Sequence, residues 1–429
     1  QPKPVAEVPA PTPAPSPPAP EPKPVAEVPA PTPAPSPPAP EPAPKPAAET
    51  PAPTPAPGKG KYQAKFNGKP VKSWAIQLQN PDPDVIARTP YDVVTIDYSR
   101  DASHEGRFTR EDVARMKRKP DGSERVLIAY MSIGEIEDYR YYWQQNGWQT
   151  KSKRPSWIGA ENPEWLQNYT VKFWNQGWKD IIYAKPDSYL DRIIDAGFDG
   201  VYLDKIDIID VLEDQVPKGA NAFNLMVEFL QGIRAKADKR KPGFLMVASN
   251  AEAALDDDDY RATMNAIGKE DLYFNSRFNS KTGKLIDGYT NDSDAIKEQV
   301  RLLQKLIDDD KVVLSVEYID SKPDLIQPTA KKLAAAGYVP YFGPRDLARL
   351  SGFTYAQAAR IAARGGEPSL AASVRKAAQC TGMQEDACGK ESRCVWIAGY
   401  RIDEATTVQG YCRIAPLDTT NRLNIEARD

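Results

Sequence analysis

The sequence contains a single histidine, His104, in the run Ser-His-Glu-Gly of a 429-residue chain. A Ser-His-Asp or Cys-His catalytic pair would have to use this one residue, and a zinc site built from two or three imidazoles is excluded. His104 lies in a polar segment, so an exposed residue without a role is the simpler interpretation. Any chemistry must therefore depend on carboxylates, hydroxyls and aromatic rings.

Long hydrophobic runs are also missing, because no apolar stretch approaches the roughly 20 residues that cross a bilayer. The formal net charge of −3 is small, and lysine and arginine form no cluster that would mark a nucleic-acid surface. We therefore expect no transmembrane segment and no nucleic-acid partner.

Cysteine is rare and confined to the last 50 residues, at Cys380, Cys388, Cys394 and Cys412. An even number of cysteines in a short stretch predicts two disulfides, which require an oxidising compartment, and three pairings are open. The spacing does not match the paired Cys-x-x-Cys of a zinc ribbon. We expect residues 376–420 to form a small disulfide-stapled module. Because the chain begins at Gln1, we interpret it as a mature secreted or periplasmic protein whose signal peptide has been removed.

Proline is unevenly distributed, with 25 of the 41 prolines in residues 1–57. Residues 2–20 are repeated identically at 22–40. Such a tract buries too few bulky apolar side chains to offset the entropy of ordering, and proline favours an extended polyproline II coil. We predict that residues 1–60 are a disordered, semi-rigid spacer that suits association with a cell wall or envelope. A ligand for a proline-binding domain is the weaker alternative.

Residues 66–365 are predicted to form a (β/α)8 TIM barrel, since short apolar runs alternate with amphipathic stretches such as 187–196 and 222–237. The candidate strands are 74–78, 93–97, 126–132, 171–174, 200–204, 245–249, 266–270, 312–317 and 338–342. These are nine, so we expect the first or the last to lie outside the barrel. A doubly wound nucleotide-binding sheet would need a glycine-rich turn after its first strand, where the sequence has Asn80-Pro-Asp-Pro.

Five predicted strand ends carry a carboxylate, namely Asp97, Glu135, Asp204, Glu270 and Glu317. The active site of such a barrel lies at the carboxyl ends of its strands. Five carboxylates that converge there would repel one another, and folding alone gives no reason for that arrangement. Two chemistries use such a cluster, namely glycoside hydrolysis by two carboxylates and Mg²⁺ or Ca²⁺ binding.

Aromatic residues near the strand ends favour the sugar chemistry, because flat apolar rings stack on sugar rings. The strand-end residues predicted to contact substrate are Trp74, Asp97, Tyr98, Tyr130, Glu135, Tyr202, Glu317 and Tyr318. The competing interpretation is that about half of the aromatic residues pack the barrel. We expect no metal and no cofactor in this site.

Three motifs stand out at the predicted strand ends, namely Tyr130-Met-Ser-Ile-Gly-Glu-Ile-Glu-Asp-Tyr-Arg140, Phe198-Asp-Gly-Val-Tyr-Leu-Asp-Lys-Ile-Asp207 and Gly268-Lys-Glu-Asp-Leu-Tyr-Phe274. Together they resemble glycoside hydrolase family 114, whose characterised members are endo-α-1,4-polygalactosaminidases. The resemblance covers roughly residues 70–345 and implies a barrel with an Asp on the fifth strand and a Glu near the seventh. By motif these are Asp204, as nucleophile, and Glu270, as acid/base of a retaining mechanism. That mechanism predicts carboxyl oxygens about 5–5.5 Å apart, against roughly 6.5–9.5 Å for inversion.

The family commonly has an Asn-Gly-Glu-like segment after strand six, where this chain reads Ser249-Asn-Ala-Glu252. The resemblance therefore adds Asn250 and Glu252 to the substrate contacts and makes Glu252 the reserve candidate for the acid. It implies an amino-sugar polysaccharide as substrate, and an acidic cleft would suit a cationic galactosamine polymer, though it would also accept a neutral glycan. The alternatives are a non-catalytic carbohydrate-binding or envelope-associated barrel, and a Ca²⁺- or Mg²⁺-dependent enzyme.

Overall fold

The computed structural model describes residues 62–350, except 164 and 279–284, and the short pieces 385–388, 394–397, 400–401, 407–408 and 411–414. The chain divides into the units Gln1–Pro51 and Ala52–Asp429, and every described residue belongs to the second. The predicted spacer therefore lies outside the described residues, and so does Cys380.

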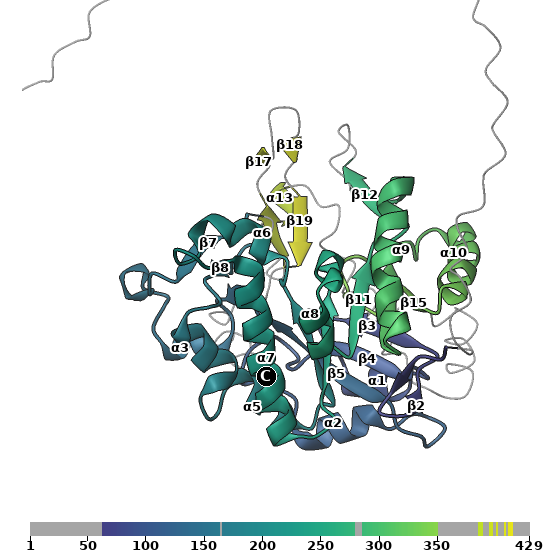
Figure 1. The fold of residues 1–429 in the computed structure, drawn as a ribbon, viewed down its shortest axis with the longest axis horizontal. Coiled ribbons are helices and arrows are strands. Elements are labelled where there is room, and N and C mark those ends of the chain that lie inside the picture. Colours follow the sequence, from purple (N-terminus) through teal and green to yellow (C-terminus); the bar gives the residue numbers. More distant parts are fainter. Residues whose placement is uncertain are drawn as a thin grey trace, which may run out of the picture. The chain divides into compact units, whose positions relative to one another are not determined.

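Eight parallel strands form the centre of the fold (Figure 1). In their order around the sheet they are β3 (Trp74–Gln77), β4 (Val93–Asp97), β5 (Val126–Ser132), β9 (Gly200–Asp204), β10 (Leu245–Ser249), β11 (Ala266–Glu270), β14 (Val312–Glu317) and β15 (Val339–Phe342). The Trp74 indole N–H donates to the Ser315 carbonyl at 3.1 Å, and its ring centroid lies 5.9 Å from that of Tyr341. These contacts bring the two ends of the sheet together and confirm the predicted TIM barrel.

Helices follow the barrel strands in alternation, as repeated βα units require. They are α1 (Pro83–Ala87), α2 (Arg110–Lys117), α5 (Tyr189–Ala196), α7 (Ala222–Arg240), α8 (Asp258–Thr263), α9 (Ser293–Asp308) and α10 (Pro323–Ala335). The start of α5 is fixed by a capping box between Ser188 and Asp191, and Gly197 ends the helix at φ +103°. Both helices predicted from periodicity, α5 and α7, are therefore confirmed.

The surplus candidate strand is the fourth, residues 171–174, so the expectation that it is the first or the last is wrong. Val171 ends β8 (Asn168–Val171), which pairs antiparallel with β6 (Glu135–Glu137) and β7 (Ile158–Glu161) outside the barrel. Phe173 is buried because it packs on Phe229 of α7, at a centroid distance of 6.0 Å. As a result β9 is the fourth barrel strand and β11 the sixth, which corrects the expected fifth and seventh.

Several insertions extend from the carboxyl ends of the barrel strands. They are the β6–β8–β7 sheet with α3 (Tyr141–Gln145) and α4 (Gln176–Lys179) after β5, α6 (Ile208–Leu212) after β9, and the hairpin of β12 (Phe274–Phe278) and β13 (Leu285–Thr290) after β11. In Figure 1, β7 and β8 lie on one side of the barrel and β12 on the other. The insertions therefore form walls around the end of the barrel where an active site is expected.

The remaining described elements are short. Single turns of 3-10 or π helix cover Lys151–Lys153, Asp180–Ala184, Glu213–Gln215 and Glu252–Asp256, and β1 (Lys65–Phe66) pairs with β2 (Lys69–Pro70). In the tail, α13 (Glu385–Cys388) precedes β16 (Cys394–Ile397), which pairs with β19 (Tyr411–Ile414), while β17 (Tyr400–Arg401) pairs with β18 (Thr407–Val408). The two disulfides stay a prediction. Within the described residues, every helix is too short or too polar to cross a membrane.

Candidate active site

Asp204 and Glu270 are the last residues of β9 and β11, with β10 between them in the sheet. Because the strands are parallel, both carboxylates lie at the same end of the barrel, and both are half-buried. The Tyr130 hydroxyl donates to Asp204 Oδ2 at 2.6 Å. Among the described residues, neither carboxylate forms an ion pair with an arginine or a lysine, which leaves both available for chemistry.

Burial raises the pKa of the Glu270 carboxyl above its ordinary value, and the negative charge of Asp204 raises it further. Hydrogen bonds from Tyr318 and Asn250 to the carboxylate offset part of this rise. The charge of Asp204 is therefore felt at Glu270, as expected for two residues at the same end of the barrel. A raised pKa favours the protonated form of Glu270, which is the form that a general acid requires.

Three hydrogen bonds hold Glu270 in place. Its carboxylate accepts from Asn250 Nδ2 at 2.8 Å and from the Tyr318 hydroxyl, and its backbone N–H donates to Asn250 Oδ1 at 3.0 Å. Asn250 thus binds both the side chain and the main chain of the same residue. The sequence-predicted contacts Tyr130, Asn250 and Tyr318 are therefore brought to the two carboxylates.

Non-glycine residues with left-handed backbone follow three neighbouring barrel strands. They are Lys205 at φ +65° after β9, Asn250 at +51° and Ala251 at +58° after β10, and Asp271 at +54° after β11. Such conformations cost energy for residues with a Cβ and tend to cluster at functional sites. Here they turn the chain sharply at the strand ends that carry Asp204, Asn250 and Glu270.

Arg345, which follows β15, connects the hairpin to the candidate acid. Its guanidinium binds both oxygens of Asp271, at 2.8 and 3.0 Å, and Asp287 of β13 at 2.8 Å. The same guanidinium lies 4.5 Å from the centroid of the Tyr318 ring, whose hydroxyl donates to Glu270. The β12–β13 wall is therefore fixed to the tyrosine that orients the acid. The sequence motifs gave no indication of Arg345.

Glu135 is connected to the Asp204 strand end by an ion pair with Lys205, the residue that follows Asp204. It is 3% exposed, accepts from Asn162 Nδ2 at 2.8 Å, and lies 3.6 Å from the Lys205 ammonium. Burial raises the pKa of the Glu135 carboxyl. Glu135 thus lies near Asp204, but its side chain is too buried for the predicted contact with a sugar. Sequence reasoning missed Lys205 and Asn162, although Lys205 lies within a quoted motif.

Asp97 is buried and paired with an arginine, contrary to the expected contact with substrate. Its two oxygens accept from Arg140 Nη1 and Nη2 at 3.0 and 2.7 Å, and the residue is only 5% exposed. Glu137 binds the same guanidinium at 2.8 Å. Tyr98, which follows Asp97 in the sequence, is fully buried against the ring of Tyr189, at a centroid distance of 5.1 Å. Both predicted contacts therefore belong to the core.

Glu317 also lies away from the cleft, because it is fully buried and accepts from the backbone N–H groups of Tyr273 and Phe274 at 2.9 and 3.1 Å. Its function in this structure is to anchor the start of the hairpin. Glu252 forms an ion pair with Lys269 at 2.8 Å, and both side chains are largely buried. Neither Glu317 nor Glu252 joins Asp204 and Glu270. Since Asp97 and Glu317 both lie in the core, the expected group of five strand-end carboxylates reduces to Asp204, Glu270 and the adjacent Glu135.

Two of the predicted aromatic contacts pack the core. Trp74 is fully buried at the first residue of β3, which is the opposite end of the barrel from Asp204. Tyr202 is fully buried on β9, and a Cβ added at Gly268 would lie 2.2 Å from its hydroxyl. Gly268 therefore leaves room for the Tyr202 ring beneath the two carboxylates, where a sugar cannot reach it.

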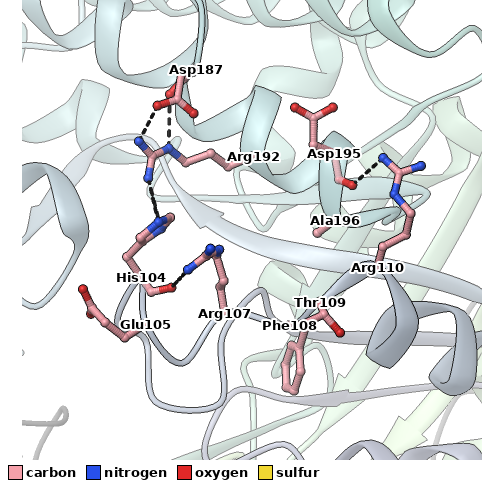
Figure 2. A pocket seen from close by; sticks show the side chains of 10 residues that line it. All are labelled: His104, Glu105, Arg107, Phe108, Thr109, Arg110, Asp187, Arg192, Asp195 and Ala196. Atoms are coloured by element: carbon pink, nitrogen blue, oxygen red, sulfur yellow. Dashed lines mark hydrogen bonds and ion pairs between the residues drawn. The ribbon is translucent and has the colours of Figure 1, made fainter.

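A separate pocket of about 620 Å³ lies between the segment that leads into α2 and helix α5 (Figure 2). Its lining includes His104 and Arg192, and Arg192 Nη1 lies 3.0 Å from His104 Nδ1. His104 is half-buried rather than exposed, and burial lowers its pKa. Asp187 and Asp195, which also line the pocket, pair with Arg192 and Arg240 at 2.6 and 2.7 Å. None of the predicted strand-end carboxylates lines this pocket.

Acidic, cysteine and histidine side chains in the described part of the chain form no group of three or more that could hold a metal ion. The site is thus built from a carboxylate pair, tyrosine hydroxyls and one asparagine amide.

Comparison with known proteins gives one family and several relatives. The sequence model of a family described as "Glycoside-hydrolase family GH114" matches residues 54–361. An uncharacterised protein of Methanocaldococcus jannaschii is 35% identical over 283 residues, covering 64% of this chain and 75% of that protein. An uncharacterised protein of Thermotoga maritima is 34% identical over 287 residues, covering 65% and 82%.

Two solved glycoside hydrolase structures are similar at low sequence identity. The glycoside hydrolase domain of PelA from Pseudomonas aeruginosa is 16% identical, with a TM-score of 0.47 over 65% of this chain and 96% of that one. Ega3 of Aspergillus fumigatus, solved in complex with galactosamine, is 17% identical, with a TM-score of 0.45 over 67% and 97%.

The buried carboxyl of Glu317 is expected to make the stability of the protein depend on pH. Burial raises its pKa from 4.5 to about 8. The folded state therefore binds a proton that the unfolded state has released, so the free energy of unfolding should fall as pH rises from about 5 to 8. Urea unfolding across this range should give a shallower fall for Glu317→Gln than for the parent. An identical slope in the two proteins would contradict the prediction.

Ala251→Gly is expected to stabilise the fold, since Ala251 is left-handed at φ +58°, a conformation that glycine adopts without a Cβ penalty. We expect a gain of up to about 1 kcal/mol in the free energy of unfolding, measured by urea denaturation. The matched control is Ala262→Gly at an exposed position of α8, where glycine should cost about 1 kcal/mol. A similar loss at both positions would refute the assigned strain.

Proposed function

The chain belongs to glycoside hydrolase family GH114, and on that premise we propose that its barrel hydrolyses bonds within an amino-sugar polysaccharide of the α-1,4-galactosaminan type. The observation that carries the proposal is the placement of Asp204 and Glu270 at one end of the barrel, each held by neutral hydrogen-bond donors. Burial and the charge of Asp204 raise the pKa of the Glu270 carboxyl in this position. Two carboxylates with different protonation states are the minimal apparatus of glycoside hydrolysis. The intact pair argues against a barrel that only binds carbohydrate.

In the proposed retaining mechanism, protonated Glu270 gives its proton to the glycosidic oxygen as that oxygen leaves the anomeric carbon. Asp204 attacks the same carbon and forms a covalent glycosyl-enzyme. Glu270, now a carboxylate, then takes a proton from a water molecule whose oxygen displaces Asp204 from the sugar. The Tyr130 hydroxyl, 2.6 Å from Asp204 Oδ2, orients the nucleophile throughout. The division of roles follows the family resemblance and the raised pKa of Glu270.

The charge near the cleft supports a cationic substrate. Besides the catalytic pair, Asp207 carries an exposed carboxylate 3.9 Å from the Lys205 ammonium, and the carboxylate of Glu135 lies 3.6 Å from the same ammonium. These two carboxylates balance the positive charge of Lys205. The remaining negative charge of the site would attract the ammonium groups of a de-N-acetylated galactosamine polymer. Ega3, one of the similar structures, was solved with galactosamine.

We further propose that the enzyme acts outside the cytoplasm, as a secreted or periplasmic protein. Four cysteines within 50 residues support an oxidising compartment, and the proline-rich repeat of residues 2–40 supports a spacer near the cell wall or envelope. This proposal rests on the sequence alone and is independent of the catalytic assignment.

Asp204→Asn and Glu270→Gln are each expected to lower kcat by about a thousandfold or more, because the first removes the nucleophile and the second the proton donor. The measurement is the release of reducing ends from de-N-acetylated α-1,4-galactosaminan, with thermal unfolding as a check on the fold. The exposed residues Asp259 and Glu228 provide matched controls as Asp259→Asn and Glu228→Gln. The assignment fails if both catalytic-site variants cleave the polymer at the parental rate.

Tyr318→Phe is expected to shift the alkaline limb of the pH profile of kcat/KM to higher pH. The Tyr318 hydroxyl donates to Glu270 and lowers the pKa of that carboxyl, so its removal should keep the acid protonated at higher pH. Tyr130→Phe is the comparison, since its hydroxyl binds Asp204 instead and should leave the alkaline limb in place. A downward shift in Tyr318→Phe would show that Glu270 is not the group that limits activity at high pH.

A further inference from the structure

Arg345, in the segment after β15, is held in one orientation by two aspartates. Its Nη1 and Nη2 donate to the two oxygens of Asp271 at 2.8 and 3.0 Å, and its Nε donates to Asp287 at 2.8 Å. All three nitrogens of the guanidinium therefore have a carboxylate partner. Pairing of this forked kind fixes the plane of the group as well as its position. The guanidinium is thus a fixed part of the wall around the candidate active site.

This guanidinium lies against the tyrosine that binds the proposed acid. Its carbon is 4.5 Å from the centroid of the Tyr318 ring, within the range of a cation–π attraction. Tyr318 is 5% exposed, and its hydroxyl donates to Glu270 Oε1. The hydroxyl moves with the ring, so a residue that fixes the ring also fixes the hydrogen bond to the carboxylate. Arg345 therefore acts on Glu270 through Tyr318.

A second connection runs through Asp271, the residue that follows Glu270. The charge of Asp271 is one of the causes that raise the pKa of the Glu270 carboxyl. Arg345 forms an ion pair with this aspartate at 2.8 Å and so cancels part of that charge. Without the arginine, the negative charge beside the acid would increase, and the protonated form of Glu270 would be favoured further.

The other ionisable groups around Glu270 do not replace this arginine. The nearest cation in the sequence, Lys269, is paired with Glu252 at 2.8 Å instead. The groups that interact electrostatically with Glu270 are acidic or phenolic, namely Asp204 and Tyr202 of β9, Asp271 after β11 and Tyr318 after β14. Arg345 brings a positive charge to this group.

The same arginine joins both strands of the β12–β13 hairpin to the acid. Asp287 of β13 is the cross-strand partner of Ser276 of β12, and the Ser276 hydroxyl donates to the same carboxylate oxygen that accepts from Arg345. Asn291, which follows β13, donates to the Asp271 carbonyl at 2.7 Å. The hairpin, the arginine and the residue after the acid therefore form one hydrogen-bonded unit.

We propose that Arg345 is a positioning residue for the proposed acid: it holds the Tyr318 hydroxyl against Glu270 and cancels the neighbouring aspartate charge. The inference rests on the proposed function and adds to it a residue that lies outside the three sequence motifs. Arg345 takes no part in the transfer of the proton or the sugar. Its substitution changes the orientation and the protonation of the acid and leaves the nucleophile in place.

The test compares the parental full chain with Arg345→Met and Arg345→Lys in the release of reducing ends from de-N-acetylated α-1,4-galactosaminan. Arg345→Met should lower kcat/KM about tenfold, since the acid loses its orientation. It should also move the alkaline limb of the pH profile up by about half a pH unit, because the charge of Asp271 is no longer cancelled.

Arg345→Lys separates charge from position, because lysine keeps the positive charge but not the fork. It should lower kcat/KM while leaving the alkaline limb near its parental place. Thermal unfolding checks that each variant is folded, and Arg345→Lys carries the test alone if Arg345→Met does not fold. Parental kcat/KM in the folded variants would overturn the proposal.

A double-mutant cycle shows whether Arg345 acts through Tyr318. On the acidic side of the limb, Arg345→Met should cost about tenfold in the parent but less than about threefold in Tyr318→Phe, which has already lost the positioned hydroxyl. The matched control is Arg261→Met, since Arg261 also bridges two aspartates, Asp258 and Asp309, and should leave kcat/KM and the limb unchanged. Equal losses from Arg345→Met in both backgrounds, or the same loss in Arg261→Met, would overturn the positioning role.

The titration of Glu270 provides a readout that needs no turnover. In NMR spectra of protein isotopically labelled at the glutamate carboxyl carbons, the Glu270 signal is the one that Glu270→Gln removes. The midpoint of its titration should rise in Arg345→Met and stay in place in Arg261→Met. If the parent cleaves no galactosaminan and this rise is seen, the proposed function fails while the effect of Arg345 on Glu270 stands. If the parent cleaves and the midpoint in Arg345→Met is parental, the inference is overturned.

Discussion

The rest of the site depends on the repulsion between Asp204 and Glu270, two half-buried carboxylates at the ends of β9 and β11, which lie on either side of β10. The protein relieves this repulsion with neutral donors, from Tyr130 on one side and from Asn250 and Tyr318 on the other. Asp97 shows the alternative, because Arg140 binds both of its oxygens and cancels its charge within the core. A charge partner of that kind would hold both carboxylates ionised and remove the protonated acid. Neutral donors instead orient the two carboxylates without bringing a positive charge beside them.

The backbone around the pair is as specialised as the side chains. Left-handed residues follow β9, β10 and β11, and one of them, Ala251, has no side-chain hydrogen bond that would compensate for the strain. Glu317 adds to this cost, since its buried carboxyl has a raised pKa and accepts from the two backbone amides at the start of the hairpin. The barrel supplies enough buried core to carry such local costs, so its mouth can be shaped for chemistry rather than stability.

The barrel could be predicted from the sequence because strands buried on both faces are continuous apolar runs bounded by turns. The run at 171–174 has the same composition but packs on Phe229 of α7, and composition does not distinguish a helix partner from a strand partner. The prediction that Asp97 and Glu317 contact substrate was wrong for a related reason. A strand-end position predicts the end of the barrel, but not whether a side chain faces the mouth, so Tyr318 reaches Glu270 while the preceding Glu317 turns under the hairpin. The pairing of Asp97 with Arg140 joins positions 43 residues apart, which no local pattern shows.

Walls and catalytic groups in this barrel form one connected structure. Parallel strands end at one edge, so every insertion after β5, β9 or β11 begins beside the carboxylate pair. Here the connection is also chemical, since Asn162 and Glu135 join the segment after β7 to Lys205 and Asp204, and Arg345 joins the β12–β13 hairpin to Tyr318 and Glu270. A glycan bound against either wall would therefore act on groups that orient the proposed catalytic pair. Under the proposed function, binding energy from sugar units remote from the cleaved bond would help to align the acid and the nucleophile.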